Sequence, residues 1–166
     1  MVHCGGTRAV ALKRFEETSI KLACSKASCR HQTMQPQPLI AVSDVEASSR
    51  WYQAVLGANS GHGGPEYEQV VCQGRVVLQL HHWDAHEHPH LGNPHSKPYG
   101  NGALLWFQTD QFDAAVGRAI ALGANMLEAP KVNPSANHRE FWLRDPDGYV
   151  VVIAGPHGDL GVTPLK

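Results

Sequence analysis

The sequence of 166 residues has no long apolar run and no paired cysteine pattern. No stretch approaches the roughly 20 apolar residues of a membrane-spanning helix, and the N-terminus lacks the apolar core of a signal peptide, so we expect no membrane partner. Three of the four cysteines, Cys4, Cys24 and Cys29, lie in the first 30 residues, and only Cys72 lies further along. A scattered set without a CxxC pair is typical of reduced thiols. We therefore expect a cytoplasmic protein without a disulfide framework.

Several familiar functional signatures are also missing, namely the P-loop, the dinucleotide-binding glycine fingerprint, the nucleophile elbow and an ordered Ser-His-Asp set. A basic stripe is missing from most of the chain. Residues 1–33 contain six Lys/Arg and two Asp/Glu, whereas the remaining residues contain eight Lys/Arg and thirteen Asp/Glu. Nucleic-acid-binding proteins need a basic surface, so we expect no nucleic-acid partner. The acidic main part of the chain is compatible with a neutral or cationic small-molecule ligand.

The N-terminal residues 1–35 show no sustained apolar period, and we expect them to form a disordered or loosely attached extension. A zinc knuckle made by Cys24, Cys29 and His31 is an alternative. We disfavour it because no second ligand pair follows at the usual spacing.

The most informative pattern is an internal repeat. The tetrapeptide Leu-Gly-Ala-Asn occurs at residues 56–59 and again at 122–125, an offset of 66 residues. Twelve residues before each copy lies an aspartate, Asp44 or Asp110, which follows a short apolar run. An aspartate accepts hydrogen bonds from the first turn of a helix, and a glycine ends a helix in the left-handed conformation. The repeat therefore predicts strand, capping aspartate, helix and glycine stop, used twice.

The periodicity and turn signals predict the same β-α-β-β-β order in both halves. In the first half, the expected elements are a strand at 38–42, a helix from Asp44 to about Leu56, a short strand within 58–65, and strands at 67–72 and 75–82. In the second half, they are a strand at 103–108, a helix between Asp110 and Gly123, a strand at 125–128, a loop at 130–137, and strands at 138–144 and 149–154. The domain then spans 36–156, with module one at 37–82, a His-rich connector at 83–101, module two at 102–155, and a loose C-terminal tail at 157–166.

The last predicted hairpin crosses the turn Asp145-Pro146-Asp147-Gly148, followed by Tyr149. Together with the internal repeat, this segment resembles the vicinal oxygen chelate superfamily, which contains glyoxalase I, bleomycin-resistance proteins, fosfomycin-resistance enzymes and extradiol dioxygenases. The resemblance covers about residues 37–156. It implies an α+β fold in which two βαβββ modules form a curled mixed sheet, a partial barrel, around a shared cup. It also implies a homodimer, because paired cups in this family assemble between chains or modules.

The metal enzymes of that family take four ligands from the first and last strands of each module. The matching positions in this sequence are Gln37, Gln79, Ala103 and Val152. Alanine and valine cannot bind a metal, and glutamine is a weak neutral ligand. The resemblance therefore implies the metal-free branch of the family, whose familiar members are antibiotic-binding resistance proteins, and we expect no cofactor.

The connector and its border contain six of the eleven histidines, between residues 81 and 95. His81, His86 and His88 are candidates for a relocated divalent-metal site, since imidazoles can build one. His81 follows Gln79 by two residues, so both side chains are expected on the cup face of one strand. The other interpretation is a lid that contacts the ligand through Trp83.

Candidate ligand-binding residues also occur in the second half. Trp106 and Trp142 are expected to stack on a planar ligand, and His138 with Glu140 is a candidate acid–base pair. Ordinary core packing is the alternative for each of them. The full predicted ligand-binding set is Gln37, Gln79, His81, Trp83, Trp106, His138, Glu140 and Trp142.

Three functions remain open from the sequence. The first is a protein that binds a small aromatic or cationic molecule, as antibiotic-resistance relatives do, without catalysis. The second is a metal-dependent lyase or dioxygenase that uses the histidine loop. The third is an interaction module whose cup is filled by side chains.

Overall fold

The computed structural model describes residues 35–83, 88 and 90–161. The chain divides into two units, Met1–Met34 and Gln35–Lys166, and every described residue belongs to the second. The predictions for the first 34 residues, including the cysteine–histidine knuckle, concern residues outside those described.

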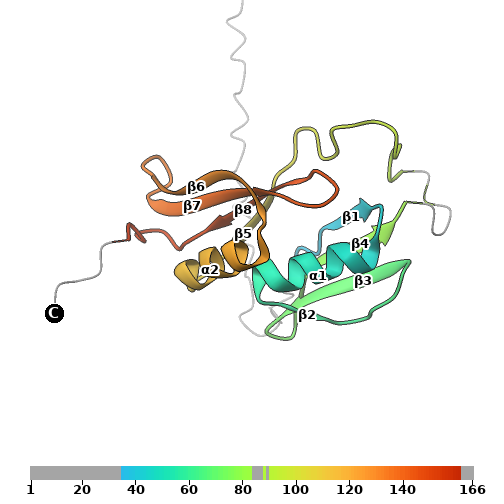
Figure 1. The fold of residues 1–166 in the computed structure, drawn as a ribbon, viewed down its shortest axis with the longest axis horizontal. Helices are drawn as coiled ribbons and strands as arrows, with labels where there is room; N and C mark the ends of the chain where they lie inside the picture. The colour runs from blue at the N-terminus through green and yellow to red at the C-terminus, as the bar shows by residue number, and fades with distance from the viewer. Residues whose placement is uncertain (1–34, 84–87, 89, 162–166) are drawn as a thin grey trace, which may run out of the picture. The chain divides into compact units, whose positions relative to one another are not determined.

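Each half of the described chain forms a four-stranded mixed sheet with one helix (Figure 1). Module one consists of β1 (Leu39–Val42), α1 (Val45–Leu56), β2 (Asn59–Ser60), β3 (Tyr67–Cys72) and β4 (Arg75–His82). Module two consists of β5 (Leu105–Gln108), α2 (Phe112–Leu122), β6 (Asn125–Asn133), β7 (His138–Arg144) and β8 (Val150–Ala154). The strand orders are β1-β4-β3-β2 and β5-β8-β7-β6, with only β1–β4 and β5–β8 parallel. The predicted α+β class with two βαβββ modules is confirmed.

The helix signals are correct in module one and partly wrong in module two. The Asp44 carboxylate accepts a hydrogen bond from the Ala47 N–H at 2.8 Å, as a capping residue does. Asp110 does not cap α2, contrary to the sequence prediction. The N-cap is Gln111, which makes no side-chain cap bond, and its N–H donates to the Thr109 hydroxyl. α1 starts directly after Asp44, whereas α2 starts two residues after Asp110. The carboxylate of Asp110 therefore lies one residue too early to cap the first turn of α2.

Gly57 ends α1 with φ of 67°, a conformation that glycine adopts without strain. A Cβ at this position would lie 3.1 Å from the guanidinium carbon of Arg118 on α2. Arg118 also donates from Nε to the Val55 carbonyl at 3.1 Å. The glycine therefore ends the helix and also leaves room for a contact between the two modules.

Two predictions for the second half of the chain are wrong, namely the length of β6 and the looseness of the tail. β6 continues to Asn133, where the sequence predicted a loop from residue 130, because the pairing with β7 resumes after irregular register around Glu128 and Lys131. Pro130 is tolerated there because β6 is an edge strand. The tail was predicted to be loose, but its described part is bound to β7. The Arg139 N–H donates to the Asp159 carbonyl at 2.8 Å, and the Arg139 guanidinium donates to the Asp159 carboxylate.

The Asp145 side chain of the last hairpin joins the two modules. Its Oδ1 accepts hydrogen bonds from the N–H groups of Asp147, Gly148 and Tyr149, which shapes the turn. Its Oδ2 accepts the hydroxyl of Tyr52 on α1 at 2.7 Å, and the Tyr52 side chain is fully buried. Burial raises the pKa of Asp145, since removal from water disfavours its charge. Burial and the neighbouring Asp145 charge raise the pKa of Tyr52 well above its ordinary value.

Two further residues of this hairpin contact module one. Asp147 accepts hydrogen bonds from the N–H of Ser43 and from the hydroxyl of Ser48, and the Tyr149 hydroxyl donates to the Ala41 carbonyl. We name the contacts of Asp145, Asp147 and Tyr149 with module one the hairpin joint. The turn that carries the family resemblance is therefore a structural connection between modules.

Glu68 on β3 is the most extensively hydrogen-bonded carboxylate of module one, and only 2% of it is exposed. Its six donors are the hydroxyls of Ser49 and Ser60 and the N–H groups of Gly61, His62, Gly63 and Gln69. Burial alone would raise the pKa of Glu68, but these hydrogen bonds lower it from 4.5 to about 2. Glu68 thus fixes the irregular segment after β2 against α1 and β3.

Candidate functional site

One face of the module-two sheet carries a cluster of aromatic and polar side chains. β5 supplies Trp106, β6 supplies Asn133, and β7 supplies His138, Glu140 and Trp142. The last three are on one face because side chains alternate along a strand. We name these five residues the tryptophan–glutamate cluster. The structure brings together the four sequence candidates of module two.

Glu140 is the centre of this cluster. Its Oε1 accepts the indole N–H of Trp142 at 2.9 Å, and its Oε2 accepts the amide of Asn133 at 3.0 Å and lies 3.2 Å from Nε2 of His138. Only 2% of Glu140 is exposed, so burial would raise its pKa. The hydrogen bonds outweigh burial and lower the pKa below its ordinary value. The cluster therefore holds an ionised carboxylate at neutral pH.

Trp106 supplies the exposed surface of the cluster. It is 44% exposed, which is unusual for an indole, and its ring centre lies 5.9 Å from that of His138 and 6.4 Å from that of Trp142. The two indoles meet edge to face, an arrangement that aromatic pairs favour. Between them in register lies Val152, which is fully buried. The result is an aromatic surface above an apolar base, beside a negative charge.

Module one has a polar face of its own. The Tyr67 hydroxyl donates to Oε1 of Gln79 and accepts from the amide of Gln69, and the Gln79 amide donates to the Gln37 carbonyl at 3.0 Å. Both ends of the Gln79 side chain are thus hydrogen-bonded within the protein. A metal ion at this position would have to share the oxygen of Gln79 with the Tyr67 hydroxyl.

Histidine rings continue this polar face. His81 is 4% exposed, lies 4.7 Å from His88 and 6.3 Å from Tyr67 between ring centres, and its Nδ1 is 2.7 Å from the His82 carbonyl oxygen. His81, Tyr67 and His62 line a hollow of about 510 Å³ with four intervening residues. Among the predicted metal candidates, the structure places His81 and His88 side by side, and His86 lies outside the described residues. No group of three or more potential ligands is found in the described part of the chain.

Trp83 lies apart from the other candidates. Its ring packs against the hydrophobic core, 5.0 Å from the ring of Tyr99, and its indole nitrogen is buried without a hydrogen-bond acceptor in the described residues. Tyr99 in turn contacts Tyr149 at 5.7 Å. Trp83 and Tyr99 therefore attach the connector to the core through their rings. A ligand contact by Trp83 remains a prediction.

The four positions that match the family's metal ligands supply few donors. Val152 is buried between the two indoles, Ala103 is exposed on the segment before β5, and Gln37 contributes its backbone carbonyl to the Gln79 amide. The side chains present therefore do not fit the standard metal site.

Sequence reasoning missed Asn133, Tyr67, Gln69 and His62. The alternation that placed Gln79 on the cup face would have placed Tyr67 and Gln69 there too, had it been applied to the neighbouring strand. Asn133 had no such signal, because it belongs to the part of β6 that was predicted as loop.

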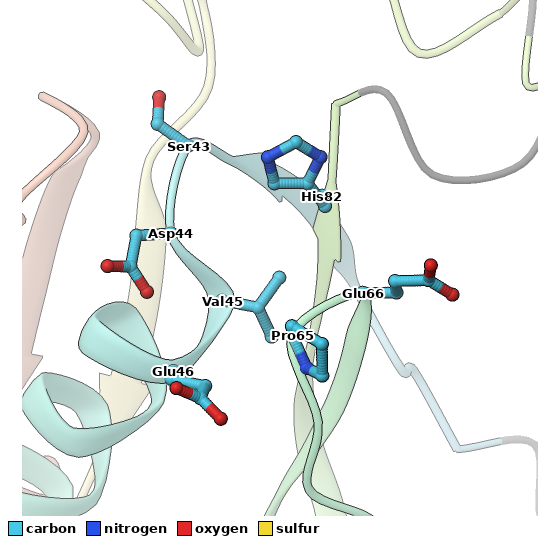
Figure 2. Close-up of a pocket in the computed structure, with 7 residues that line it drawn as sticks. All are labelled: Ser43, Asp44, Val45, Glu46, Pro65, Glu66 and His82. Carbon is cyan, nitrogen blue, oxygen red and sulfur yellow. The ribbon is translucent and has the colours of Figure 1, made fainter.

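Another hollow, of about 420 Å³, lies beside the start of α1 and is lined by Asp44, Glu46, Glu66 and His82 with three further residues (Figure 2). The three carboxylates point in different directions rather than toward one point (Figure 2). Asp44 is already used as the helix cap. We therefore do not assign this acidic hollow as the site.

The tryptophan–glutamate cluster and the polar face of module one are separate in the single chain. Among the described residues, hydrogen bonds and ring contacts connect the members of each face but do not connect one face with the other. The modules instead meet through α1 against α2 and through the hairpin joint. Neither of the helices that the structure describes is long and apolar enough to cross a membrane.

Comparison with known proteins gives the family. Residues 32–153 match the family model of the Glyoxalase/Bleomycin resistance protein/Dioxygenase superfamily. Glyoxalase I of Saccharomyces cerevisiae is 25% identical over 138 residues, which cover 72% of this chain but only 42% of that protein. Among solved structures, TioX from Micromonospora sp. has a TM-score of 0.60 at 14% identity, with 74% of this chain and 98% of TioX covered.

The fosfomycin resistance protein FosX from Listeria monocytogenes has a TM-score of 0.55 at 14% identity, with 75% of this chain and 93% of FosX covered. At these identities the structural likeness concerns the fold alone. With the family model matching most of the chain, the two βαβββ modules and the Asp-Pro-Asp-Gly turn, this protein belongs to the Glyoxalase/Bleomycin resistance protein/Dioxygenase superfamily.

Proposed function

We propose that this protein binds a small aromatic or cationic organic molecule on the tryptophan–glutamate cluster, without the metal site of the family's enzymes. The observation that carries the proposal is the exposed indole of Trp106 beside the ionised Glu140. A soluble domain gains nothing in folding from an exposed indole, whereas a planar or positively charged ligand gains dispersion and cation–π attraction from it.

The residues at the positions of the family's metal ligands support a metal-free state. Val152 and Ala103 offer no donor atom, and both ends of the Gln79 side chain are engaged by Tyr67 and Gln37. The cluster instead offers aromatic surface and one fixed negative charge, which suits binding by shape and charge.

We also propose that two copies of the chain complete the cup. β1 and β5 are edge strands of their sheets, and Leu39, Leu104 and Trp106 near these edges are each at least 40% exposed. Edge strands and exposed apolar side chains are features that a partner surface covers. A homodimer would bring the polar face of one copy opposite the tryptophan–glutamate cluster of the other.

The test of the binding function is a truncation of the exposed indole. A thermal-shift and calorimetric screen of planar cations and glycopeptide drugs identifies the ligand that the wild type binds most tightly. Trp106→Ala should weaken the binding of that ligand by about 2 kcal/mol, roughly a 30-fold increase in Kd. Ile120→Ala is the matched control, because Ile120 is an exposed apolar residue on α2. A flat screen with the wild-type protein, or equal affinity of the Trp106 variant, would contradict the proposal.

One observation favours the second candidate, a metal-dependent lyase or dioxygenase. The rings of His81 and His88 lie 4.7 Å apart beside the hollow of module one. We expect protein purified without a His tag to retain no stoichiometric divalent metal by elemental analysis. Stoichiometric metal that is lost in both His81→Ala and His88→Ala would favour the enzyme and overturn the metal-free proposal.

A further inference from the structure

The imidazole of His138 is oriented by a carboxylate whose charge state is fixed. Its Nε2 lies 3.2 Å from Oε2 of Glu140. Because the pKa of Glu140 is lowered, this carboxylate is ionised at neutral pH and can only accept hydrogen bonds. The proton between them therefore belongs to Nε2. In the neutral ring, Nδ1 then carries the lone pair and is a hydrogen-bond acceptor.

That acceptor is unused by the protein. Nδ1 of His138 has no hydrogen-bond partner among the described residues, whereas Nε2 is engaged by Glu140. The side chain is 13% exposed, and its ring contacts the exposed ring of Trp106 at 5.9 Å between centres. A partly exposed acceptor beside an exposed indole is a combination that a bound donor would use.

The charges around His138 favour a cation. Glu140 lies on its own strand, and the Asp159 carboxylate of the C-terminal segment is held against β7 by the Arg139 side chain. On β6, Lys131 is opposite Glu140 in register but forms an ion pair with Glu128. Leaving Arg139 aside, these groups carry one positive charge, on Lys131, and three negative charges, on Glu128, Glu140 and Asp159.

Arg139 is the other nearby cation, and it is fully occupied. Its guanidinium binds the carboxylates of Asp113 and Asp159, and it lies 4.5 Å over the ring of Phe112. It therefore neutralises Asp159 in part without facing a ligand on the cluster. The ionised Glu140 and the indole face of Trp106 determine which charge the cluster attracts.

We propose that Nδ1 of His138 accepts a hydrogen bond from a primary or secondary organic ammonium group, whose charge lies against the ring of Trp106. The proposal rests on the binding function proposed above and names the ligand class. Glu140 is the positioning residue, because it holds the ring in the tautomer that leaves Nδ1 free. A quaternary ammonium has the same charge but no N–H, so it would bind through the indole alone.

The tautomer is testable without a ligand. In nitrogen NMR spectra of histidine-labelled protein at pH 8, the His138 ring should show the Nε2–H tautomer, with Nδ1 unprotonated. In Glu140→Gln, the amide can donate to Nε2, and the Nδ1–H tautomer should become populated. A wild-type ring in the Nδ1–H tautomer overturns the proposal, and so does an unchanged tautomer in the glutamine variant.

The ligand class is testable with one matched pair, phenethylammonium and phenethyltrimethylammonium. By calorimetry at pH 8, the wild type should bind the first about tenfold more tightly, because a charge-assisted hydrogen bond is added. In His138→Phe, which keeps a ring, the two should bind within about twofold of each other. Equal affinities in the wild type, or a preference that survives in the phenylalanine variant, overturn the proposal.

The outcomes distinguish a failure of this proposal from a failure of the proposed binding function on which it rests. If neutral aromatic compounds bind in a manner that depends on Trp106 but neither ammonium compound does, the ligand class is wrong and the binding function stands. If no compound of the whole panel binds the wild type, both fail. If the phenylalanine variant does not fold, the wild-type preference and the wild-type tautomer each decide the proposal alone.

Discussion

Replacing Asp145 with alanine should lower the free energy of unfolding by about 4 kcal/mol. The change removes the acceptor of three backbone N–H groups and of the buried Tyr52 hydroxyl, and buried donors without partners are strongly destabilising. The same change removes the bond between the last hairpin and Tyr52 of α1, so both modules lose a contact. Urea denaturation at neutral pH measures the effect.

The matched variant is Asp145→Asn. Its amide oxygen can still accept from the backbone N–H groups, and its NH₂ group can donate to the Tyr52 hydroxyl. The expected loss is therefore smaller, about 1–2 kcal/mol. Equal losses in the two variants, or a loss below about 1 kcal/mol in the alanine variant, would show that the hairpin joint does not hold the modules together.

Replacing Glu68 with glutamine should cost about 2–3 kcal/mol at neutral pH and should remove a pH dependence. The pKa of Glu68 is lowered from 4.5 to about 2 in the folded protein, so the folded state prefers the ionised form. The resulting stability is fully present above pH 4.5 and is lost as the pH falls from 4.5 toward 2. The glutamine cannot ionise, so this part of the acid sensitivity should disappear with it.

The measurement is the free energy of unfolding as a function of pH between 7 and 2.5. Glu46→Gln is the control, because Glu46 is an exposed carboxylate of the same module on α1. The wild type and the control should lose stability in parallel, while the Glu68 variant starts lower and declines less. If the difference between wild type and Glu68→Gln is the same at pH 7 and pH 2.5, the hydrogen bonds do not stabilise the charged form.

Local patterns allowed most of the fold to be predicted. β3, β4 and β7 occur at the predicted residues, and Gly57 and Gly123 end the helices as expected, because alternation and glycine stops depend on neighbouring residues. Apart from the Asp110 cap, which is lost because α2 starts one residue later, the errors concern interactions between distant residues. The tail is bound by Arg139 and β6 is extended by pairing with β7, and neither contact leaves a signal within the tail or strand itself.

The candidate site was predictable to the extent that it depends on one strand. Alternation placed His138, Glu140 and Trp142 on one face, and the structure shows them together. The separation of this face from Gln79 and His81 was not predictable, because it depends on how two whole modules pack. The ionisation of Glu140 was not predictable either, since one of its donors, Asn133, comes from the irregular half of β6.

The hairpin joint has a consequence for how the duplicated halves are related. Tyr52 and Arg118 occupy equivalent positions of the repeat, 66 residues apart, and each reaches from its own helix into the other half. Yet Tyr52 donates to a carboxylate, whereas Arg118 donates to the backbone carbonyl of Val55. The two halves share one architecture but make different contacts from the same position of the repeat, so the interface between them is asymmetric.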